Sequence, residues 1–450
     1  MSTNGVVKHD ELPVLVIGAG VSGLAIAHGL HLNNIPYRLF ERDDHLTSRS
    51  TRDWALACHW SLPHLATLLG EEKWSRIASA QIDPSLAPKD AEVVKVINGA
   101  TGDVENGVRF ENLRRFLRSR LRSLIAEGLR VEYGKKLERI TYSEANGEAG
   151  GVRIVTAYFA DGESVKGRLL IGADGSHSRV RNLLLGAEKA RLRRLPFAAT
   201  FINASFSREQ ALYLRSFHPI INIIVHPENM VGMLGTLDAA SPDPEQWGFT
   251  FYISWKASVE EQDAESNVMD VRERLAQAKE MSRSWGEPLR SCHEWTNDDH
   301  NKVYYGGLAN WDPAEEDHRW DNHGGLVTLM GDAAHPMTYH RGQGLNHALA
   351  DAAKLVALLS GASEPRPQSQ GELIVDYEAE MIARGGEEVR LSEMNSFMLH
   401  DFSKVEQSPL MKRGLAFHGD KGAKPATVVP KATTNGTAMV ETAVQSAAAL

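Results

Sequence analysis

The chain has 450 residues, 42% of them hydrophobic and 24% charged, which is enough for two or three domains with a sizeable core. Its formal net charge of −9 argues against a general nucleic-acid-binding role. Cys58 and Cys292 are too few for a disulfide framework or a cysteine metal site, so we expect a reducing, cytoplasmic environment and no metal. No signal-peptide pattern or apolar run of membrane-spanning length is found, and no membrane span is expected.

A glycine-rich turn follows the first apolar strand of the sequence. The strand, 14–17, leads into GAGVSG, after which a helical pattern continues. Gly18 permits the turn, Gly20 lets backbone N–H groups approach a pyrophosphate, and Gly23 allows the helix to lie close to the strand. Phosphates would then lie at the helix N-terminus, where free N–H groups and the helix dipole favour negative charge.

A second short strand, 37–40, ends at an acidic residue, Glu41, which stands 18 residues after Gly23. A carboxylate at this strand tip can accept both ribose hydroxyls of an adenosine. The same carboxylate would repel a 2′-phosphate, so the sequence predicts FAD or NAD as the bound dinucleotide. Beyond it, a loop from Asp53 is expected to lead into a helix that begins at Leu62, and two short strands are expected within 91–105.

A basic amphipathic helix is predicted over 113–127, in a region that carries six arginines (109–122). Such a cluster is usually a solvated face, but a dinucleotide site also needs a cation for its diphosphate. An Arg-x-x-Leu-x-x-x-Leu/Ile pattern begins at Arg114 or at Arg118. We prefer Arg118 as the cation for the diphosphate, because its phase places the helix end closer to the following strand. Replacing Arg122 is then expected to weaken dinucleotide binding much less than replacing Arg118.

A second motif lies at 172–181, after strands expected at 129–133, 137–142 and 152–159. A buried strand, 169–172, precedes the turn at Asp174-Gly175, and Ser176 or Ser178 can cap the helix that follows. From 191 to 294 the alternating apolar pattern predicts an antiparallel sheet inserted into the dinucleotide domain, with a helix near 268–283. This sheet should cover a ligand site, and Tyr305 to Asp312 should return to the first domain.

A third motif begins where a buried strand ends at Gly331-Asp332. Asp332 can hold a sugar or ribityl hydroxyl, and Gly342-Gln343-Gly344 opens a helix whose N–H groups point at whatever lies ahead of it. The stretch 346–354 has the pattern of an ordinary amphipathic helix, and a further helix is expected over 372–394. From about 414 onward, few large apolar residues occur, which predicts a disordered tail.

The three motifs, GAGVSG (18–23), GADGSHSRVR (172–181) and GDAAHPM with RGQGLNHALAD (331–351), stand in family-like order. Over about residues 12–395 the chain resembles the single-component (class A) flavoprotein monooxygenases, a family of aromatic and salicylate-type hydroxylases, and most closely their fungal secondary-metabolism branch. The resemblance implies an FAD site made of Gly18, Gly20, Gly23, Glu41, Arg118, Asp174, Gly175, Asp332, Gly342, Gly344 and Leu345. It also implies that Asp174 and Gly175 serve the transient nicotinamide cofactor.

The implied fold is α/β, with a Rossmann-like FAD-binding domain (12–190 and 295–365) and an inserted antiparallel β-sheet substrate or lid domain (191–294). A C-terminal helical segment (366–413) follows, and 1–11 and 414–450 are expected to be flexible or disordered. The implied reaction uses NAD(P)H and O2 through a C4a-hydroperoxyflavin to oxygenate an electron-rich aromatic or polycyclic small molecule. The oligomeric state is not predicted.

Two departures from the family pattern concern the substrate pocket. Tyr339-His340 replaces a proline that usually lies close to the flavin, and Asp53–Leu56 is bulkier than the small segment expected there. Candidate catalytic residues are Arg194, Tyr213 and His59, with Arg193, Arg215, His335 and Tyr339 also in range, although each could simply be a surface or core residue. Epoxidation, Baeyer-Villiger oxidation, oxidative decarboxylation and a non-catalytic flavin-binding regulator remain alternatives, and halogenation is less favoured because the chain lacks a Trp-x-Trp-x-Ile-Pro element.

Overall fold

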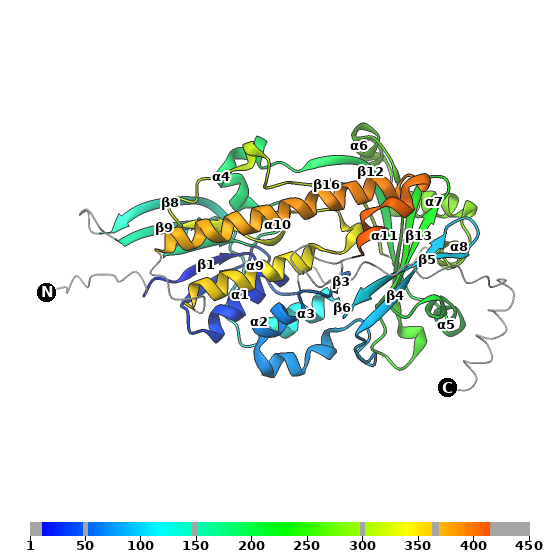
Figure 1. The fold of residues 1–450 in the computed structure, drawn as a ribbon, viewed down its shortest axis with the longest axis horizontal. Helices are drawn as coiled ribbons and strands as arrows, with labels where there is room; N and C mark the ends of the chain where they lie inside the picture. Colours follow the sequence, from blue (N-terminus) through cyan, green and yellow to red (C-terminus); the bar gives the residue numbers. More distant parts are fainter. Residues whose placement is uncertain (1–10, 48–52, 146–151, 298–301, 362–368, 415–450) are drawn as a thin grey trace.

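The computed structural model describes residues 11–47, 53–145, 152–297, 302–361 and 369–414; the predicted terminal segments therefore lie almost entirely outside the described residues. A five-stranded parallel sheet organises one half of the molecule (Figure 1). Its order is β17 (Val327–Leu329), β11 (Leu169–Gly172), β1 (Val14–Ile17), β2 (Tyr37–Phe40) and β7 (Val131–Glu132). Three of these strands, β1, β2 and β11, have the predicted bounds, and the continuous burial of β1 and β11 is typical of a parallel sheet covered on both faces.

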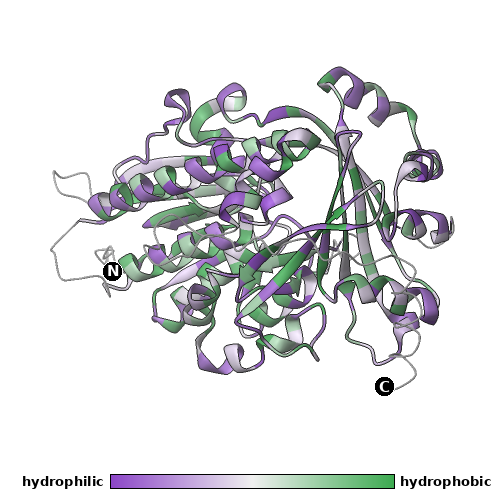
Figure 2. Cartoon of the chain, turned by 45° about the vertical axis from the view of Figure 1, so that its right-hand side comes forward, coloured by the Kyte–Doolittle hydropathy of each residue, from purple (hydrophilic) through white to green (hydrophobic). Residues whose placement is uncertain are grey.

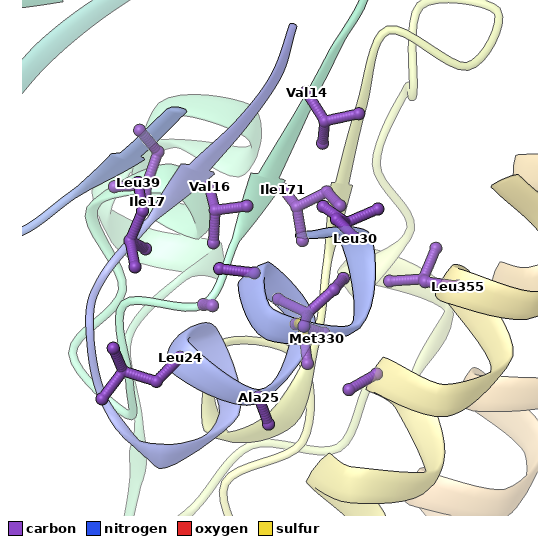
Figure 3. Close-up of a cluster of buried hydrophobic side chains, with 14 of the residues drawn as sticks. Val14, Val16, Ile17, Leu24, Ala25, Leu30, Leu39, Ile171, Met330 and Leu355 are labelled. Atoms are coloured by element: carbon purple, nitrogen blue, oxygen red, sulfur yellow. The ribbon is translucent and has the colours of Figure 1, made fainter. Parts of the chain in front are cut away.

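Two helices, α1 (Val21–Leu32) and α9 (Gly344–Leu359), pack together against this sheet. Figure 3 shows Leu30 of α1 between Ile171 of β11 and Leu355 of α9, and these side chains belong to one buried core. A three-stranded antiparallel sheet, β8 (Leu137–Ala145), β9 (Val152–Phe159) and β10 (Ser164–Gly167), contributes to the same core. The 30-residue helix α10 (Gln370–Leu399) runs beside α9 and reaches the other half of the molecule (Figure 1).

The other half is a seven-stranded sheet with strand order β16-β12-β15-β14-β13-β4-β5. The predicted antiparallel sheet is present as β12 (Arg193–Ala204), β13 (Ile221–His226), β14 (Met230–Asp238) and β15 (Gly248–Lys256). It also includes β4 (Ala91–Asn98), β5 (Val104–Glu111) and β16 (Lys302–Asn310), which lie outside 191–294 in the sequence. Residues Tyr305 to Asp312 were expected to return to the first domain. This is wrong for residues up to Asn310, because they belong to β16, which pairs with β12 in the seven-stranded sheet.

One face of this sheet is covered by helices, namely α5 (Arg208–Phe217), α7 (Val271–Met281) and α8 (Leu289–Trp295), while α6 (Val259–Val268) packs on β12 and β16. The opposite, inner face is turned toward the parallel-sheet half and the C-terminal segment that ends in α11 (Pro409–Arg413) (Figure 1). In Figure 2, hydrophobic residues concentrate in the strands and hydrophilic residues on the outer helices. No helix in the described part of the chain combines the length and apolarity needed to cross a membrane.

The predicted basic helix is partly wrong. Residues Arg114–Leu117 form a strand, β6, which pairs with β3 (Ala55–Cys58), and the helix α3 begins only at Arg118 and ends at Ala126. The segment before α2 (Leu62–Ser75) is thus a strand where a loop was expected. Pairing between segments about 60 residues apart overrides the local helical pattern, which a single sequence window does not reveal.

Candidate functional site

The three glycines of the first motif meet different constraints. Gly18 has a φ of +103°, and a Cβ there would lie 2.6 Å from the Ala173 carbonyl oxygen. A Cβ on Gly23 would lie 1.8 Å from the Gly18 carbonyl oxygen, so this glycine sets how closely α1 approaches the turn. A Cβ on Gly20 would meet no protein atom within 4 Å, and its φ is −67°. Close approach of a ligand explains a glycine at position 20, whereas packing and φ do not.

Gly20 is also the N-cap of α1, which has no side-chain cap and no acidic residue in its first turn. By contrast, α4 (Arg179–Lys189), α5, α6, α7 and α10 each begin with a Ser or Asp side chain that accepts a backbone N–H. The first N–H groups of α1 therefore remain available to an anion. The open space at Gly20 and this uncapped helix start fit the diphosphate of a dinucleotide.

The peptide of Ala19, within the turn, is held from both sides. Its N–H donates to Glu41 Oε2 at 2.8 Å, and its carbonyl oxygen accepts from Arg122 Nε at 3.2 Å and Nη2 at 3.0 Å. Glu41 Oε1 accepts from the Asp43 N–H at 3.1 Å, and both Glu41 and Arg122 are buried. Glu41 therefore fixes the turn, and its contact to a ribose stays a prediction.

The arginines around β6 and α3 are not a shared solvated face. The guanidinium of Arg118 lies 4.4 Å from the centroid of the Trp54 ring, and that of Arg114 lies 5.4 Å from the Trp74 ring. Arg122, expected to matter much less than Arg118, instead supports the glycine turn and is 5% exposed. An Arg122 variant therefore perturbs the turn itself and is unsuitable as a neutral control.

The assignment of Arg118 to the FAD diphosphate is tested by Arg118→Ala. We expect this variant to lose FAD affinity equivalent to one charge-assisted hydrogen bond, about 1.5–3 kcal/mol, with the melting temperature of the apoprotein unchanged. Arg114→Ala removes the same charge from the neighbouring strand and should retain FAD. Fluorescence titration of apoprotein with FAD gives both affinities, and equal affinities in the two variants contradict the assignment.

In the second motif, the carboxylate of Asp174 organises the start of α4. Its Oδ1 accepts from Ser178 Oγ at 2.5 Å, and its Oδ2 accepts from the Arg179 and Val180 N–H groups at 2.6 and 3.1 Å. Ser178 is the N-cap and accepts from the Arg181 N–H at 2.9 Å, which selects it over Ser176. The backbone of Asp174 also abuts Gly18, so the second motif lies directly beside the first.

Arg181 links the second motif to the third. Its Nη2 donates to the Ser176 carbonyl oxygen at 2.5 Å, and its Nη1 donates to the Ala333 carbonyl oxygen at 2.8 Å. The guanidinium is 1% exposed and lies 4.9 Å from the centroid of the Trp311 ring, and burial lowers the pKa of Arg181 to about 10. The sequence indicated an arginine here but not that its side chain joins two motifs.

The third motif places an exposed carboxylate at the start of α9. Asp332 has no hydrogen-bond partner for its carboxylate among the residues the structure describes, and its Oδ1 lies 3.7 Å from where a Cβ on Gly344 would be. A Cβ on Gly344 would make no other contact within 4 Å, and Gly344 has no positive φ. As at Gly20, neither packing nor backbone conformation explains the glycine. Gly342 differs, because its φ of 62° lies in the left-handed region that favours glycine. Like α1, α9 has no side-chain cap.

A buried network holds the Gly331-Asp332 segment. Asp351 Oδ2 accepts from the Gly331 N–H and His335 Nε2, both at 2.7 Å, and its Oδ1 accepts from Arg384 Nη2 at 2.6 Å. Burial acts to raise the pKa of Asp351, but the charges of His335 and Arg384 outweigh it and hold that pKa well below its ordinary value. The structure therefore places His335, in the loop before α9, as a positioning residue. Its partner Asp351 lies in the stretch 346–354, which was predicted to be an ordinary amphipathic helix.

A second network fixes the Gly342-Gln343-Gly344 turn. Asn346 is buried; its Oδ1 accepts from the His59 N–H at 2.9 Å, and its Nδ2 donates to His59 Nε2 at 3.0 Å. Trp60 Nε1 donates to Gln343 Oε1 at 2.9 Å. Burial lowers the pKa of His59 to about 3, so its imidazole is neutral near pH 7 and is already hydrogen-bonded. These contacts indicate that His59 positions the turn and argue against an acid–base role.

The inner face of the seven-stranded sheet carries an aromatic cluster in which Phe201 and Tyr339 are partly accessible and Tyr252 is buried. Phe201 of β12 and Tyr252 of β15 have ring centroids 4.9 Å apart, and Tyr339 lies edge-on to them at 5.2 and 5.4 Å. Tyr339 is 38% exposed, and Phe201 is half-buried. Three apolar neighbours on the same face are also half-buried: Ile221, Ile223 and Met233. We call this surface the aromatic wall.

Other candidate catalytic residues lie away from the aromatic wall. Arg194 Nη1 pairs with Asp263 Oδ1 of α6 at 2.7 Å, and Tyr213 of α5 packs beside Trp295, with ring centroids 5.7 Å apart, on the helix-covered face. Arg193 pairs with Glu393 and Arg215 with Asp83. Only Tyr339, among the candidates weighed from the sequence, is in the wall.

Comparison with known proteins agrees with this geometry. Residues 113–392 match the family model described as an FAD binding domain. The chain is 37% identical to the FAD-dependent monooxygenase phnB of Penicillium herquei, covering 89% of this chain and 94% of that one. It is 34% identical to the FAD-dependent monooxygenase cctM of Talaromyces islandicus, covering 90% and 97%.

Two solved structures share the fold. The 2,6-dihydroxypyridine-3-hydroxylase from Arthrobacter nicotinovorans has a TM-score of 0.69 at 16% identity, covering 95% of this chain and 100% of that one. Klebsiella pneumoniae HpxO, complexed with FAD and uric acid, has a TM-score of 0.66 at 20% identity, covering 90% and 93%. With three motifs brought together and a family match over more than half its length, this chain belongs to the class A FAD-dependent monooxygenases, with FAD as its cofactor.

Proposed function

We propose that this monooxygenase uses NAD(P)H and O2 to insert one oxygen atom into a planar, electron-rich aromatic or polycyclic molecule of secondary metabolism. The observation that carries the proposal is the aromatic wall of Phe201, Tyr252 and Tyr339, in which Phe201 and Tyr339 leave ring surface accessible for a flat molecule to pack against. One structural neighbour is named as a hydroxylase of a dihydroxypyridine and another was solved in complex with uric acid; both compounds are flat heterocycles, which supports the same substrate class.

The chain's own residues have distinct roles in this proposal. The N–H groups of α1 bind the diphosphate with Arg118, Glu41 accepts the ribose hydroxyls, and Asp332 holds the ribityl chain. The N-terminus of α9, at Gly344 and Leu345, presents N–H groups that would stabilise negative charge on the flavin ring of FAD. Asp174 and Gly175 serve FAD and the visiting nicotinamide, and Gly342 shapes the turn.

Bound FAD would supply the redox chemistry, accepting a hydride and activating O2. The protein must then keep water from the reacting atoms, and the inner face of the seven-stranded sheet is the surface suited to that task. We further propose a cytoplasmic location, because Cys58 and Cys292 are both free and buried.

The test is whether aromatic compounds stimulate NAD(P)H oxidation by the purified holoenzyme. We expect flat aromatic compounds to accelerate oxidation and saturated analogues of similar size to leave it at its basal rate. Product mass then separates hydroxylation or epoxidation from Baeyer-Villiger oxidation and oxidative decarboxylation. Basal oxidation with every aromatic compound in a broad panel contradicts the proposed function.

A further inference from the structure

Arg115 is a buried cation with few protein partners. It is 7% exposed, and its Nη1 donates to the Ile220 carbonyl oxygen at 3.1 Å. Among the described residues no carboxylate pairs with it, and the only titratable group that acts on its charge is the Tyr252 hydroxyl. Burial lowers the pKa of Arg115 to about 10, which leaves the guanidinium charged at neutral pH.

Other buried arginines in the described part of the chain are better satisfied. Arg274, Arg341 and Arg384 each pair with a carboxylate, whereas Arg122 and Arg181 donate at least three hydrogen bonds to carbonyl oxygens. None of the Arg115 guanidinium nitrogens is among the sealed polar atoms that lack a partner. The guanidinium nitrogens of Arg115 that have no protein partner are therefore accessible to solvent or to a ligand. A buried cation in this state is costly unless something supplies the missing negative charge.

The position of Arg115 indicates what could supply that charge. It faces Ala57 across the β3–β6 pair, and the Ala57 Cβ lies 3.4 Å from where a Cβ on Gly342 would be. On the other side, a Cβ on Gly235 of β14 would lie 2.5 Å from Arg115 Nη1 and 3.4 Å from Met233 Sδ. Arg115 therefore lies between the glycine turn before α9 and the inner face of the seven-stranded sheet.

We infer that Arg115 binds an anionic oxygen of the substrate, and that the enzyme therefore selects acidic aromatic molecules over neutral ones of the same shape. The anion is a carboxylate or an ionised phenol or enol, since a planar guanidinium donates to either. The adjacent aromatic wall, through Tyr252 and Met233, would hold the ring that carries this oxygen. This inference rests on the proposed function and adds the charge of the substrate to it.

The test compares binding of anionic and neutral naphthalenes to the holoenzyme by isothermal titration calorimetry near pH 7.5. One pair is 2-naphthoate and methyl 2-naphthoate; the other is 4-nitro-1-naphthol, which is ionised at this pH, and its methyl ether. We expect the wild-type enzyme to bind at least one anion about 10- to 100-fold more tightly than its neutral partner. Whichever pair shows the larger ratio identifies the carboxylate or the phenolate as the anion.

Arg115→Met removes the charge and keeps an unbranched apolar side chain of comparable length. We expect it to reduce the anion-to-neutral ratio to near one, while FAD content and binding of the neutral compounds stay within about twofold. The melting temperature should not fall, because replacing an uncompensated buried cation by an apolar residue is not destabilising in general. Arg114→Met, one residue earlier on β6 and stacked over Trp74, should keep the wild-type ratio.

A preserved ratio in Arg115→Met overturns the inference, as does a wild-type enzyme without preference for either anion. Equal weakening of anionic and neutral ligands together with a lower melting temperature assigns Arg115 a merely structural role and also overturns it. NAD(P)H oxidation in the same samples reports the proposed function separately. Equal stimulation by neutral and anionic aromatic compounds rejects the role of Arg115 alone, whereas no stimulation by any of them rejects the proposed function.

Discussion

Gly20→Val is expected to give a folded protein that purifies largely without FAD. The added side chain enters the space that the FAD diphosphate needs, but a Cβ at this position meets no protein atom within 4 Å. We expect FAD affinity to fall at least about 100-fold, or about 2.7 kcal/mol, because the close backbone approach is lost. The apoprotein melting temperature should change by little, since an N-cap substitution of glycine costs only a few tenths to about 1 kcal/mol.

Two further glycines serve as controls for this prediction. Gly23→Ala places a Cβ 1.8 Å from the Gly18 carbonyl oxygen, so it should destabilise the apoprotein itself by about 1–3 kcal/mol or more. Gly306→Val, on β16, has equal free space around its Cβ but lies outside the three motifs, and should leave FAD affinity unchanged. A Gly20→Val protein that purifies with a full complement of FAD would show that the phosphates bind elsewhere.

Gly344→Val is expected to retain FAD but to lose most of the coupling between NAD(P)H oxidation and product formation. A β-branched side chain at the first residue of α9 would hold the ring system away from the helix N–H groups. The loss of these preorganised donors should raise the barrier to reduction by about 3 kcal/mol and release hydrogen peroxide in place of product. Stopped-flow reduction rates and the ratio of peroxide to product are the measurements.

The room around Gly344 makes this prediction specific. A Cβ at this position would make only one ordinary contact, at 3.7 Å with Asp332 Oδ1, so the variant should fold normally. Gly306→Val again provides the control, with wild-type reduction and coupling. Unchanged reduction and coupling in Gly344→Val would mean that the start of α9 does not face the reacting ring, and the proposed cofactor orientation would then be withdrawn.

The strands β1 and β11 of the parallel sheet were predictable from sequence because each is a short, continuously apolar run that leads into a glycine-containing turn. Strands β1, β2 and β11 have the predicted bounds, as does β9. The three motifs also come together as their order suggested, with Gly18 against Asp174 and Arg181 joined to Ala333. Local chemistry, namely which residues permit a turn or cap a helix, determines these features.

Other features depend on pairing between distant segments and were not predictable. The strand β6 carries a helical pattern locally, and only its partner β3 makes it extended. Buried polar residues of α9 and α10, such as Asn346, Asp351 and Arg384, look like solvated positions in sequence, although they hold the third motif. Their position on an otherwise apolar helix face was the one feature of the sequence that could have indicated their burial. The burial of Arg115 was likewise not predictable, because it stands within a run of arginines whose pattern is typical of a solvated basic surface.

The most direct test of the account is the fate of molecular oxygen during turnover. The holoenzyme would be given NAD(P)H, an aromatic compound that stimulates its oxidation, and ¹⁸O₂, and the product would be analysed by mass spectrometry. We expect one ¹⁸O atom in each product molecule and one NAD(P)H consumed per coupled turnover. A product that carries oxygen from water, or complete conversion of ¹⁸O₂ to hydrogen peroxide with every stimulating compound, would contradict a monooxygenase acting at the aromatic wall.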